Sequence, residues 1–383
     1  EFIPVARISD MLLEPGEIFP YNGREIKYPD IKLVYWAGGN PFHHQMNLKK
    51  LVKAFKQPDS IIVNEIWWNS LARHSDIILP ANTSIEKNDI GIRHWDQTIS
   101  PMQKIIEPIG ESKSDYEIFS EISAKLNFKD KFTENRNEDQ WLRCMWEEAK
   151  EGAKESGFNL PEFDKFWKNG FQEVLSPKKQ TILLEEFIKD PIKNSISTPS
   201  GKIEIFSETI ESFNYKDCPG HPIWLEQDEW LGSPLTKQYP LQLISGQPYN
   251  RLHSQLDNGS ESQKDKISGR EAIKIHPQDA LTRKLKDGDI VEIFNKRGRC
   301  LAGVVISKEV MKGVVFLPVG AWYDPIEDGG FCVHGNPNVL TADIGTSSLS
   351  QGPSAHSTLV EVKKFMKELP PINILDKPNI VNK

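Results

Sequence analysis

Residues 31–40 read IKLVYWAGGN, and this stretch decides how the first part of the chain is interpreted. The apolar, β-branched and aromatic run 31–37 predicts a buried strand, and the glycine pair after it permits a turn with positive φ. Helical and strand patterns then alternate: a helix at 46–55, a strand at 60–66, a helical stretch at 68–75 and a strand at 76–81. Such alternation predicts a parallel sheet with right-handed crossovers.

Polar residues follow two of these strands. Ligands of parallel sheets bind at the carboxyl ends of the strands, where Gly38-Gly39-Asn40 and Asn64-Glu65 stand. The glycine turn either lets backbone N–H groups approach a phosphate or is only a tight turn after a strand. Glu65 either accepts a hydrogen bond from a ribose or a guanine, or is a solvated strand end.

The second half of the chain has a different character. A helix capped by Ser114 or Asp115 is predicted at 115–126, and surface helices are predicted at 139–157. Residues 160–235 look irregular, with a hairpin strand at 198–207. From about residue 238, short β-rich runs with glycine turns predict a β-barrel. Within it, 276–300 predicts a helical turn, a D-G turn and a hairpin. We expect an α/β domain at 1–225, with an irregular insert at 127–225, and a β-barrel domain at 226–383.

Composition excludes several classes of protein. The chain has 383 residues, which is enough for two or three domains, and a net charge of −7, which argues against nucleic acid as a partner. It has no apolar run of about 18 residues, so no membrane span is expected. The four cysteines, at 144, 218, 300 and 332, form no CxxC pair. This pattern indicates reduced structural thiols rather than a zinc or iron–sulfur site, with disulfide pairing left open.

The densest polar cluster follows the strand-like run 240–245. It comprises Arg251, His253, Ser254 and Gln255, which together offer donors and acceptors to a ligand. Earlier in the chain, the neighbouring histidines 43 and 44 suit a phosphate or a ring edge.

Other polar and aromatic residues leave alternatives open. Asn336 and Asn338 flank a proline, and their amides either serve a heteroaromatic ring or belong to a proline turn. The cluster at 73–76 (RHSD) lacks a nucleophile elbow, so structural hydrogen bonds are the favoured reading. Tryptophans 67, 68, 95 and 322 either pack in a core or line a cofactor slot.

Five long motifs in this order resemble a known family. They are YWAGGNPFHHQ (35–45), WWNSLARHSDIILPANTSIEKNDIG (67–91), SDYEIF (114–119), RLHSQLDN (251–258) and GNPNVLTADIGTSSLSQG (335–352). They resemble the C-terminal half of the molybdopterin oxidoreductases, in particular the dimethyl sulfoxide, trimethylamine N-oxide and biotin sulfoxide reductase branch. The resemblance covers most of the chain and is weakest at 127–235.

This resemblance implies a fold, a cofactor and a reaction. The fold would be an α/β parallel-sheet domain followed by a six-stranded double-psi β-barrel. The cofactor would be bis-(molybdopterin guanine dinucleotide) molybdenum, with no iron–sulfur cluster in this chain. The reaction would transfer oxygen from an S-oxide or an N-oxide to molybdenum, which in this branch carries a serine ligand. That serine lies in the N-terminal half, so the resemblance assigns no catalytic residue and no metal ligand here, and it makes the missing half a partner.

The resemblance also implies which residues bind the cofactor. Those positions are Gly39, Asn40, His44, Asn64, Glu65, Lys87, Asp115, Ser245, Gly246, Gln247, Pro248, Arg251, His253, Ser254, Gln255, Asn338, Gln351 and Gly352. Four of the matched positions depart from the family pattern. Asn64-Glu65 stands where His-Asp is usual, Lys87 replaces an arginine, and Gln247 replaces a histidine. A lysine offers a point charge in place of a planar fork.

The sequence therefore predicts the cofactor-binding half of a molybdenum S-oxide or N-oxide reductase, inactive alone. Two alternatives remain. One is another bis-molybdopterin enzyme, such as a formate dehydrogenase or a nitrate reductase. The other is a stand-alone guanine-nucleotide-binding module. The electron donor stays open, and so does the compartment, with the bacterial periplasm and cytoplasm both compatible.

Overall fold

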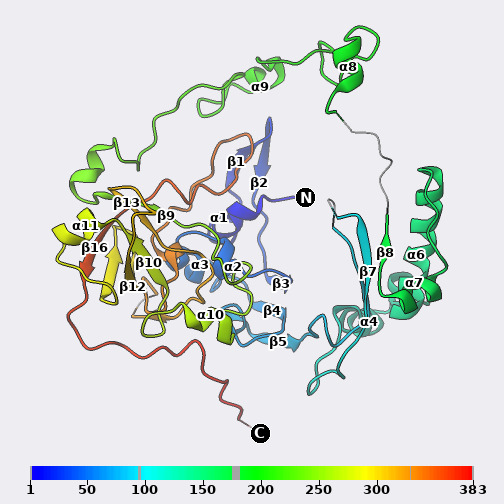
Figure 1. Cartoon of the computed structure of the whole chain (residues 1–383), viewed down its shortest axis with the longest axis horizontal. Helices are drawn as coiled ribbons and strands as arrows, with labels where there is room; N and C mark the ends of the chain where they lie inside the picture. The colour runs from blue at the N-terminus through cyan, green and yellow to red at the C-terminus, as the bar shows by residue number, and fades with distance from the viewer. Residues whose placement is uncertain (1, 94–95, 175–181, 328, 382–383) are drawn as a thin grey trace. The chain divides into compact units, whose positions relative to one another are not determined.

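The computed structural model describes residues 2–93, 96–174, 182–327 and 329–381 (Figure 1). The chain forms two compact units. The barrel unit comprises Glu1–Val63, Trp67–Ile77 and Ile205–Lys383, and the helical unit comprises Asn64–Ile66 and Ile78–Glu204. Neither unit begins or ends at the expected domain boundary near residue 225. That boundary stays a prediction about domain organisation.

Six strands close the barrel of the barrel unit. They are β9 (Leu241–Ile244), β10 (Ala272–Ile275), β11 (Ile290–Phe294), β12 (Arg299–Ile306), β13 (Val314–Phe316) and β16 (Leu359–Lys364). Their order is β10-β13-β9-β16-β11-β12, and a parallel pairing of β10 with β12 closes the ring. Two short strands, β14 (Pro325–Ile326) and β15 (Phe331–Cys332), extend the sheet from β12. The predicted six-stranded double-psi barrel is confirmed.

The segment 276–300 folds as its sequence predicts. It forms α11 (Pro277–Thr282), a turn in which Gly288 has a φ of 80°, and the antiparallel hairpin of β11 and β12. Consecutive residues of both hairpin strands are buried, and Val291, Ile293 and Leu301 are fully buried.

A three-stranded parallel sheet lies near the start of the chain. It consists of β3 (Leu33–Ala37), β4 (Ser60–Glu65) and β5 (Ile77–Pro80), in that order. Hydrogen bonds from Asp76 N to Ile61 O and from Ala81 N to Glu65 O advance together along β4 and β5, as parallel pairing requires. Two helices, α2 (Pro41–His44) and α3 (Leu48–Ala54), follow β3. The predicted parallel-sheet α/β pattern is confirmed.

Two local predictions about this region were wrong. The strand predicted as buried, β3, leaves Leu33 55% exposed, because β3 is the edge of the sheet and has a neighbour on one side only. The helical stretch 68–75 contains only the 3-10 turn η2 (Ala72–His74). There the Asn69 side chain accepts hydrogen bonds from the backbone N–H groups of Leu71 and Ala72, which competes with a longer helix.

Short elements complete the described part of the barrel unit. They are η1 (Val5–Arg7), α1 (Ile8–Leu13), β1 (Ile18–Tyr21), β2 (Arg24–Lys27), α9 (Glu208–Ser212), η3 (Pro234–Lys237), α10 (Ser260–Lys264) and η4 (Pro337–Val339).

The helical unit combines a small sheet with helices. Its described elements are β6 (Asp89–Gly91), β7 (Thr98–Met102), α4 (Asp115–Lys125), α5 (Lys129–Thr133), α6 (Glu138–Glu155), α7 (Phe163–Asn169), β8 (Gln172–Glu173) and α8 (Glu185–Lys189). Its core includes a stack of Trp146 on Phe166, with ring centroids 3.8 Å apart. As predicted, Ser114 caps α4, in a capping box with Glu117.

The hairpin strand predicted at 198–207 is not formed. Instead, Thr198 Oγ1 donates to the carbonyl of Lys202 at 2.6 Å, and Ser200 N donates to Glu204 Oε1 at 2.8 Å. These local side-chain bonds favour a turn over a strand. In the part of the chain that the structure describes, no helix is long and apolar enough to cross a membrane.

Packing around β12 generates a stability prediction. A Cβ added at Gly303 would lie 2.2 Å from Ile267 Cβ, so we expect Gly303→Ala to destabilise the protein by about 1–3 kcal/mol. Gly152 on α6 has open space around it, and Gly152→Ala should stabilise by roughly 0.5–1 kcal/mol. Urea unfolding followed by tryptophan fluorescence measures both changes. Equal midpoints for the two variants would contradict this account of the barrel.

Candidate cofactor-binding site

Three imidazoles from two distant segments gather in the barrel unit. His43 and His44 end α2, and His253 lies in the loop after β9. The ring centroids of His43 and His44 are 4.9 Å apart, as are those of His43 and His253. His43 Nε2 lies 2.9 Å from His253 Nδ1, and Gln247 Nε2 lies 2.9 Å from the same His253 nitrogen. We call these four residues the imidazole cluster.

Asn40 joins the two segments a second time. Its Oδ1 accepts from Phe42 N at 3.0 Å, which caps α2, and its Nδ2 donates to Ser254 Oγ at 3.3 Å. The preceding Gly38 and Gly39 have φ values of 77° and 78°, and a Cβ added at Gly38 would meet nothing within 4 Å. The glycine turn therefore leaves open space in front of the backbone.

Two asparagines hold the backbone of α2 from the other side. Asn338 Nδ2 donates to the carbonyl of His43 at 2.7 Å, and Asn336 Nδ2 donates to the carbonyls of Phe42 and Ala321, each at 2.9 Å. Both asparagines are buried. The Oδ1 of Asn338 accepts from Thr341 Oγ1 at 3.0 Å. These amides fix the carbonyls that would otherwise be unsatisfied in a buried turn.

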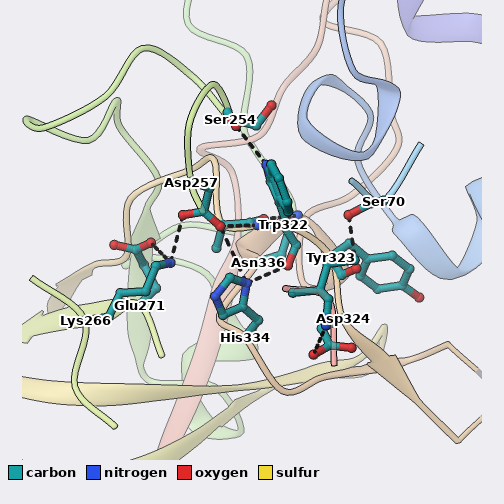
Figure 2. Close-up of polar contacts among 12 residues, drawn as sticks. Ser70, Ser254, Asp257, Lys266, Glu271, Trp322, Tyr323, Asp324, His334 and Asn336 are labelled. Carbon is teal, nitrogen blue, oxygen red and sulfur yellow. Dashed lines mark hydrogen bonds and ion pairs between the residues drawn. The ribbon is translucent and has the colours of Figure 1, made fainter. Parts of the chain in front are cut away.

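Arg251 points inward, into a buried group of charges. Its Nη2 donates to Glu271 Oε2 at 2.7 Å, and its Nε lies 3.5 Å from Asp257 Oδ1. Lys266 Nζ bridges the two carboxylates, at 2.9 Å from Asp257 Oδ1 and 3.1 Å from Glu271 Oε2 (Figure 2). All four side chains are at most 5% exposed. Two positive and two negative charges thus neutralise one another away from water.

Asp257 connects this charge group to the loop of the imidazole cluster. Its Oδ2 accepts from Trp322 N at 2.8 Å, and Trp322 Nε1 donates to the carbonyl of Ser254 at 2.8 Å (Figure 2). Trp322 is only 4% exposed, so it packs in the core. Gly320 completes the support, because a Cβ there would lie 2.0 Å from the carbonyl oxygen of His253.

Burial disfavours the charged form of three imidazoles in this region, those of His43, His44 and His334. Burial, with the nearby His44, His253 and Arg251, lowers the pKa of His43 to about 3. Burial and the neighbouring His253 lower the pKa of His44. Near the charge group, burial and the positive charge of Lys266 lower the pKa of His334 to about 4. At neutral pH the site therefore offers uncharged hydrogen-bonding groups.

The remaining predicted residues of the barrel unit lie on two loops. Ser245 begins the loop after β9, and its Oγ is buried without a hydrogen-bond partner among the described residues. Gly246, Pro248 and the exposed Gln255 lie on the same loop. Gln351 lies on the other loop, next to Gly352, and donates from Nε2 to the carbonyl of Pro20 at 2.8 Å. Whether these residues bind a cofactor stays a prediction.

The four predicted residues of the helical unit include one direct pair. Asn64 Nδ2 donates to Asp115 Oδ1 at 2.8 Å, and Asp115 is the first residue of α4. The Glu65 carboxylate accepts from the backbone N–H of Ile66 at 2.8 Å, and Lys87 Nζ lies 3.8 Å from Asp89 Oδ2. The pair of Asn64 and Asp115 is consistent with one polar site at the end of β4.

Two predictions about other polar and aromatic residues can now be compared with the structure. At 73–76, Arg73 donates to carbonyls of the C-terminal tail, such as Asn373 O, while His74 contacts Ser70 O and Asp76 accepts from Ile61 N. The favoured structural reading is therefore confirmed. Among the tryptophans, Trp67 is partly exposed, Trp322 is buried, and residue 95 lies outside the described residues.

Several site residues escaped the sequence analysis. They are Asp257, Lys266, Glu271 and His334. A charged residue in a polar loop reads as solvated, since the pairing that buries it is a tertiary contact. Asp257 did lie within the motif RLHSQLDN, but the motif does not indicate that its side chain is buried.

A closed barrel and a parallel sheet whose loops offer neutral hydrogen-bonding groups define a cofactor-binding α/β protein. Residues 10–125 match the family Molybdopterin oxidoreductase, and residues 241–359 match the Molydopterin dinucleotide binding domain. The chain therefore carries domains of the molybdopterin oxidoreductase family at these residues. The resemblance seen in the sequence is thereby confirmed.

Named relatives have similar sequences along nearly the whole chain. The trimethylamine-N-oxide reductase of Haemophilus influenzae is 45% identical over 99% of this chain and 47% of its own length. The biotin sulfoxide reductase of Cereibacter sphaeroides is 44% identical over 94% of this chain and 48% of its own length. The dimethyl sulfoxide/trimethylamine N-oxide reductase of Rhodobacter capsulatus is 42% identical over 95% and 45%. The chain thus spans about half the length of these relatives.

One solved structure shares the fold. Acetylene hydratase from Pelobacter acetylenicus superimposes with a TM-score of 0.65 at 18% identity, and the match covers 88% of this chain and 45% of that protein. At this identity the likeness concerns the fold alone.

The residues present fit a molybdopterin cofactor. Such a cofactor joins polar heterocycles to phosphates, so it needs neutral donors and acceptors and close backbone approach. The imidazole cluster provides the former, and the turn with open space at Gly38 provides the latter. The buried, unpartnered Ser245 Oγ is the kind of atom that a bound ligand satisfies.

The buried His334 generates a pH prediction. Its pKa is near 6.5 in the unfolded chain and about 4 in the fold, so on acidification the unfolded state binds the proton first. The stability that the neutral His334 contributes to the fold is therefore complete above pH 6.5 and is lost as the pH falls toward 4. Between about pH 7.5 and about pH 5 the loss should be about 2 kcal/mol. His334→Asn should reduce the pH dependence of the unfolding free energy by that amount, measured by urea unfolding at each pH, and an unchanged pH dependence would contradict the assignment to His334.

Proposed function

We propose that this chain is the cofactor-holding half of a molybdenum reductase that acts on S-oxides or N-oxides, such as dimethyl sulfoxide, trimethylamine N-oxide or biotin sulfoxide. One observation carries the proposal. The loop before α2, the loop after β9 and the turn at η4 meet at one imidazole cluster, through the bonds of Asn40 to Ser254, His43 to His253 and Asn338 to His43. Relatives with those activities are 42–45% identical to this chain.

The proposed cofactor is bis-(molybdopterin guanine dinucleotide) molybdenum, with no iron–sulfur cluster in this chain. When bound, molybdenum supplies the oxygen-atom transfer, and the protein supplies binding and orientation. In the barrel unit the candidate residues are Gly39, Asn40, His44, Ser245, Gly246, Gln247, Pro248, Arg251, His253, Ser254, Gln255, Asn338, Gln351 and Gly352.

In the helical unit, the candidates are Asn64, Glu65, Lys87 and Asp115. The carboxylates of Glu65 and Asp115 suit the donor edge of a guanine or the hydroxyls of a ribose. Lys87 suits a phosphate oxygen as a point charge.

Arg251 has a different part in this proposal. Glu271 and Asp257 neutralise its guanidinium. We therefore propose that Arg251 fixes the loop that carries His253 and affects cofactor binding indirectly, through the position of that loop. Its direct contact with the cofactor, expected from the resemblance, stays a prediction.

Substrate, metal ligand and electron supply depend on the half of the enzyme that precedes this chain. Within the described residues, no group of three or more histidine, cysteine, aspartate or glutamate side chains is arranged to hold a metal ion. From the resemblance, we propose the preceding half as the partner that supplies the metal ligand.

The central test compares the chain with the whole enzyme. We expect the full-length enzyme, produced in a host that makes the molybdenum cofactor, to reduce trimethylamine N-oxide, dimethyl sulfoxide or biotin sulfoxide, and the 383-residue chain alone to show no turnover. Acid release of guanine nucleotide and the absence of iron in the purified enzyme would support the cofactor assignment. Turnover of nitrate or formate with none of the oxides would favour the other enzyme branch instead.

The stand-alone alternative has a separate measurement. Isothermal titration of the isolated chain with GDP distinguishes a nucleotide-binding module from half of a shared site. Because the proposed site is closed by several segments, including absent ones, we expect weak or undetectable binding. Tight binding of GDP by the chain alone would favour the module.

A further inference from the structure

The protons of the imidazole cluster can be placed from the contacts of His253. Gln247 Nε2 is an amide nitrogen that only donates, so His253 Nδ1 at 2.9 Å is the acceptor and carries no proton. The same Nδ1 also faces His43 Nε2 at 2.9 Å, so the two groups share its single lone pair. His43 must therefore donate from Nε2, and its ring, being neutral, has no proton left for Nδ1.

His43 Nδ1 is thus a lone pair that needs a donor. The His43 residue is 7% exposed, and Nδ1 is buried with no hydrogen-bond partner among the described residues. A buried acceptor without a donor costs free energy, and native proteins rarely leave one unsatisfied. Neither flanking group resolves this, since Asn338 binds the carbonyl of His43 and His44 meets the ring edge-on.

The kind of ligand that satisfies this atom follows from its charge. A phosphate oxygen only accepts hydrogen bonds, so a proton-free Nδ1 cannot bind it. Arg251 does not change this, because its guanidinium is already paired with Glu271 and Asp257. The atom instead fits an N–H group. With its proton on Nε2, His253 adds a donor to this acceptor, and pterin and guanine both present a donor and an acceptor along one ring edge.

We propose that His43 is a cofactor-binding residue whose Nδ1 accepts a hydrogen bond from the N–H edge of the cofactor's pterin or guanine, and that the imidazole cluster reads this ring edge rather than the pyrophosphate. The inference rests on the proposed function and specifies which chemical part of the cofactor this loop holds. The resemblance implied only the neighbouring His44, and the sequence had left a phosphate and a ring edge open for both histidines.

A matched pair of variants separates ligand binding from mere support of His253. Asparagine places an amide oxygen near the position of Nδ1 and loses the group at Nε2. Glutamine places an amide nitrogen near Nε2, which keeps the bond to His253, and loses the acceptor at Nδ1. We expect full-length His43→Asn to retain molybdenum and pterin at close to the wild-type level. His43→Gln should release them about tenfold faster, the effect of one lost hydrogen bond to a buried group.

The control is His356→Gln, which changes an exposed histidine outside the cluster and should leave cofactor release unchanged. The opposite order, with the Gln variant retaining cofactor and the Asn variant losing it, would show that His43 only supports His253. If the Gln variant does not fold, the Asn variant decides alone, and cofactor loss from a folded Asn variant overturns the inference. A wild-type enzyme without any pterin would instead refute the proposed function itself.

Separate probes identify the ring. Titrations of cofactor-free full-length enzyme with guanosine, with a simple pterin and with inorganic pyrophosphate report the three parts independently. We expect His43→Gln to weaken either guanosine or pterin about tenfold and to leave pyrophosphate unchanged. Weakened pyrophosphate binding, or no change for either heterocycle, would overturn the inference.

Discussion

The neutralised charges beneath the imidazole cluster are the constraint on which the barrel-unit site depends. Asp257 receives Lys266 and Arg251 on one oxygen and the backbone of Trp322 on the other. Trp322 Nε1 in turn donates to the carbonyl of Ser254. The buried ion pairs therefore help to fix the position of the loop that carries Ser254. Buried charges of this kind add little to stability when paired, but they tolerate only one arrangement. That arrangement holds His253 against His43.

Motif order and strand patterns were enough to predict the architecture. The run 31–37, the alternation up to residue 81 and the β-rich stretch after 238 predicted a parallel sheet and a closed barrel, and both are present. These features depend on local periodicity, which a sequence displays directly. The burial of β3 was not predictable in this way, because an apolar strand has the same sequence at the edge of a sheet as at its centre.

The sequence indicated candidate residues for the site, but not which partners their side chains contact. Asn40, His253 and Ser254 were singled out by type and position, and the structure brings them together. Arg251 was expected to bind the cofactor, which stays a prediction; its pairing with Glu271 was not foreseen, because Glu271 lies 20 residues further along the chain. The amides of Asn336 and Asn338 likewise turn toward backbone carbonyls of α2, a use that no spacing rule reveals.

The way the polypeptide is divided between its two units has a practical meaning for dissection. The chain passes from one unit to the other after Val63, Ile66, Ile77 and Glu204, so neither unit is a continuous piece of sequence. A single cut, wherever it is made, leaves at least one unit with a segment missing. A truncation that stays within 1–63 or within 205–383 removes residues of the barrel unit only, whereas one that extends into 64–204 removes residues of both units. Truncation from either end therefore cannot assign an effect to the helical unit alone, and point substitutions can.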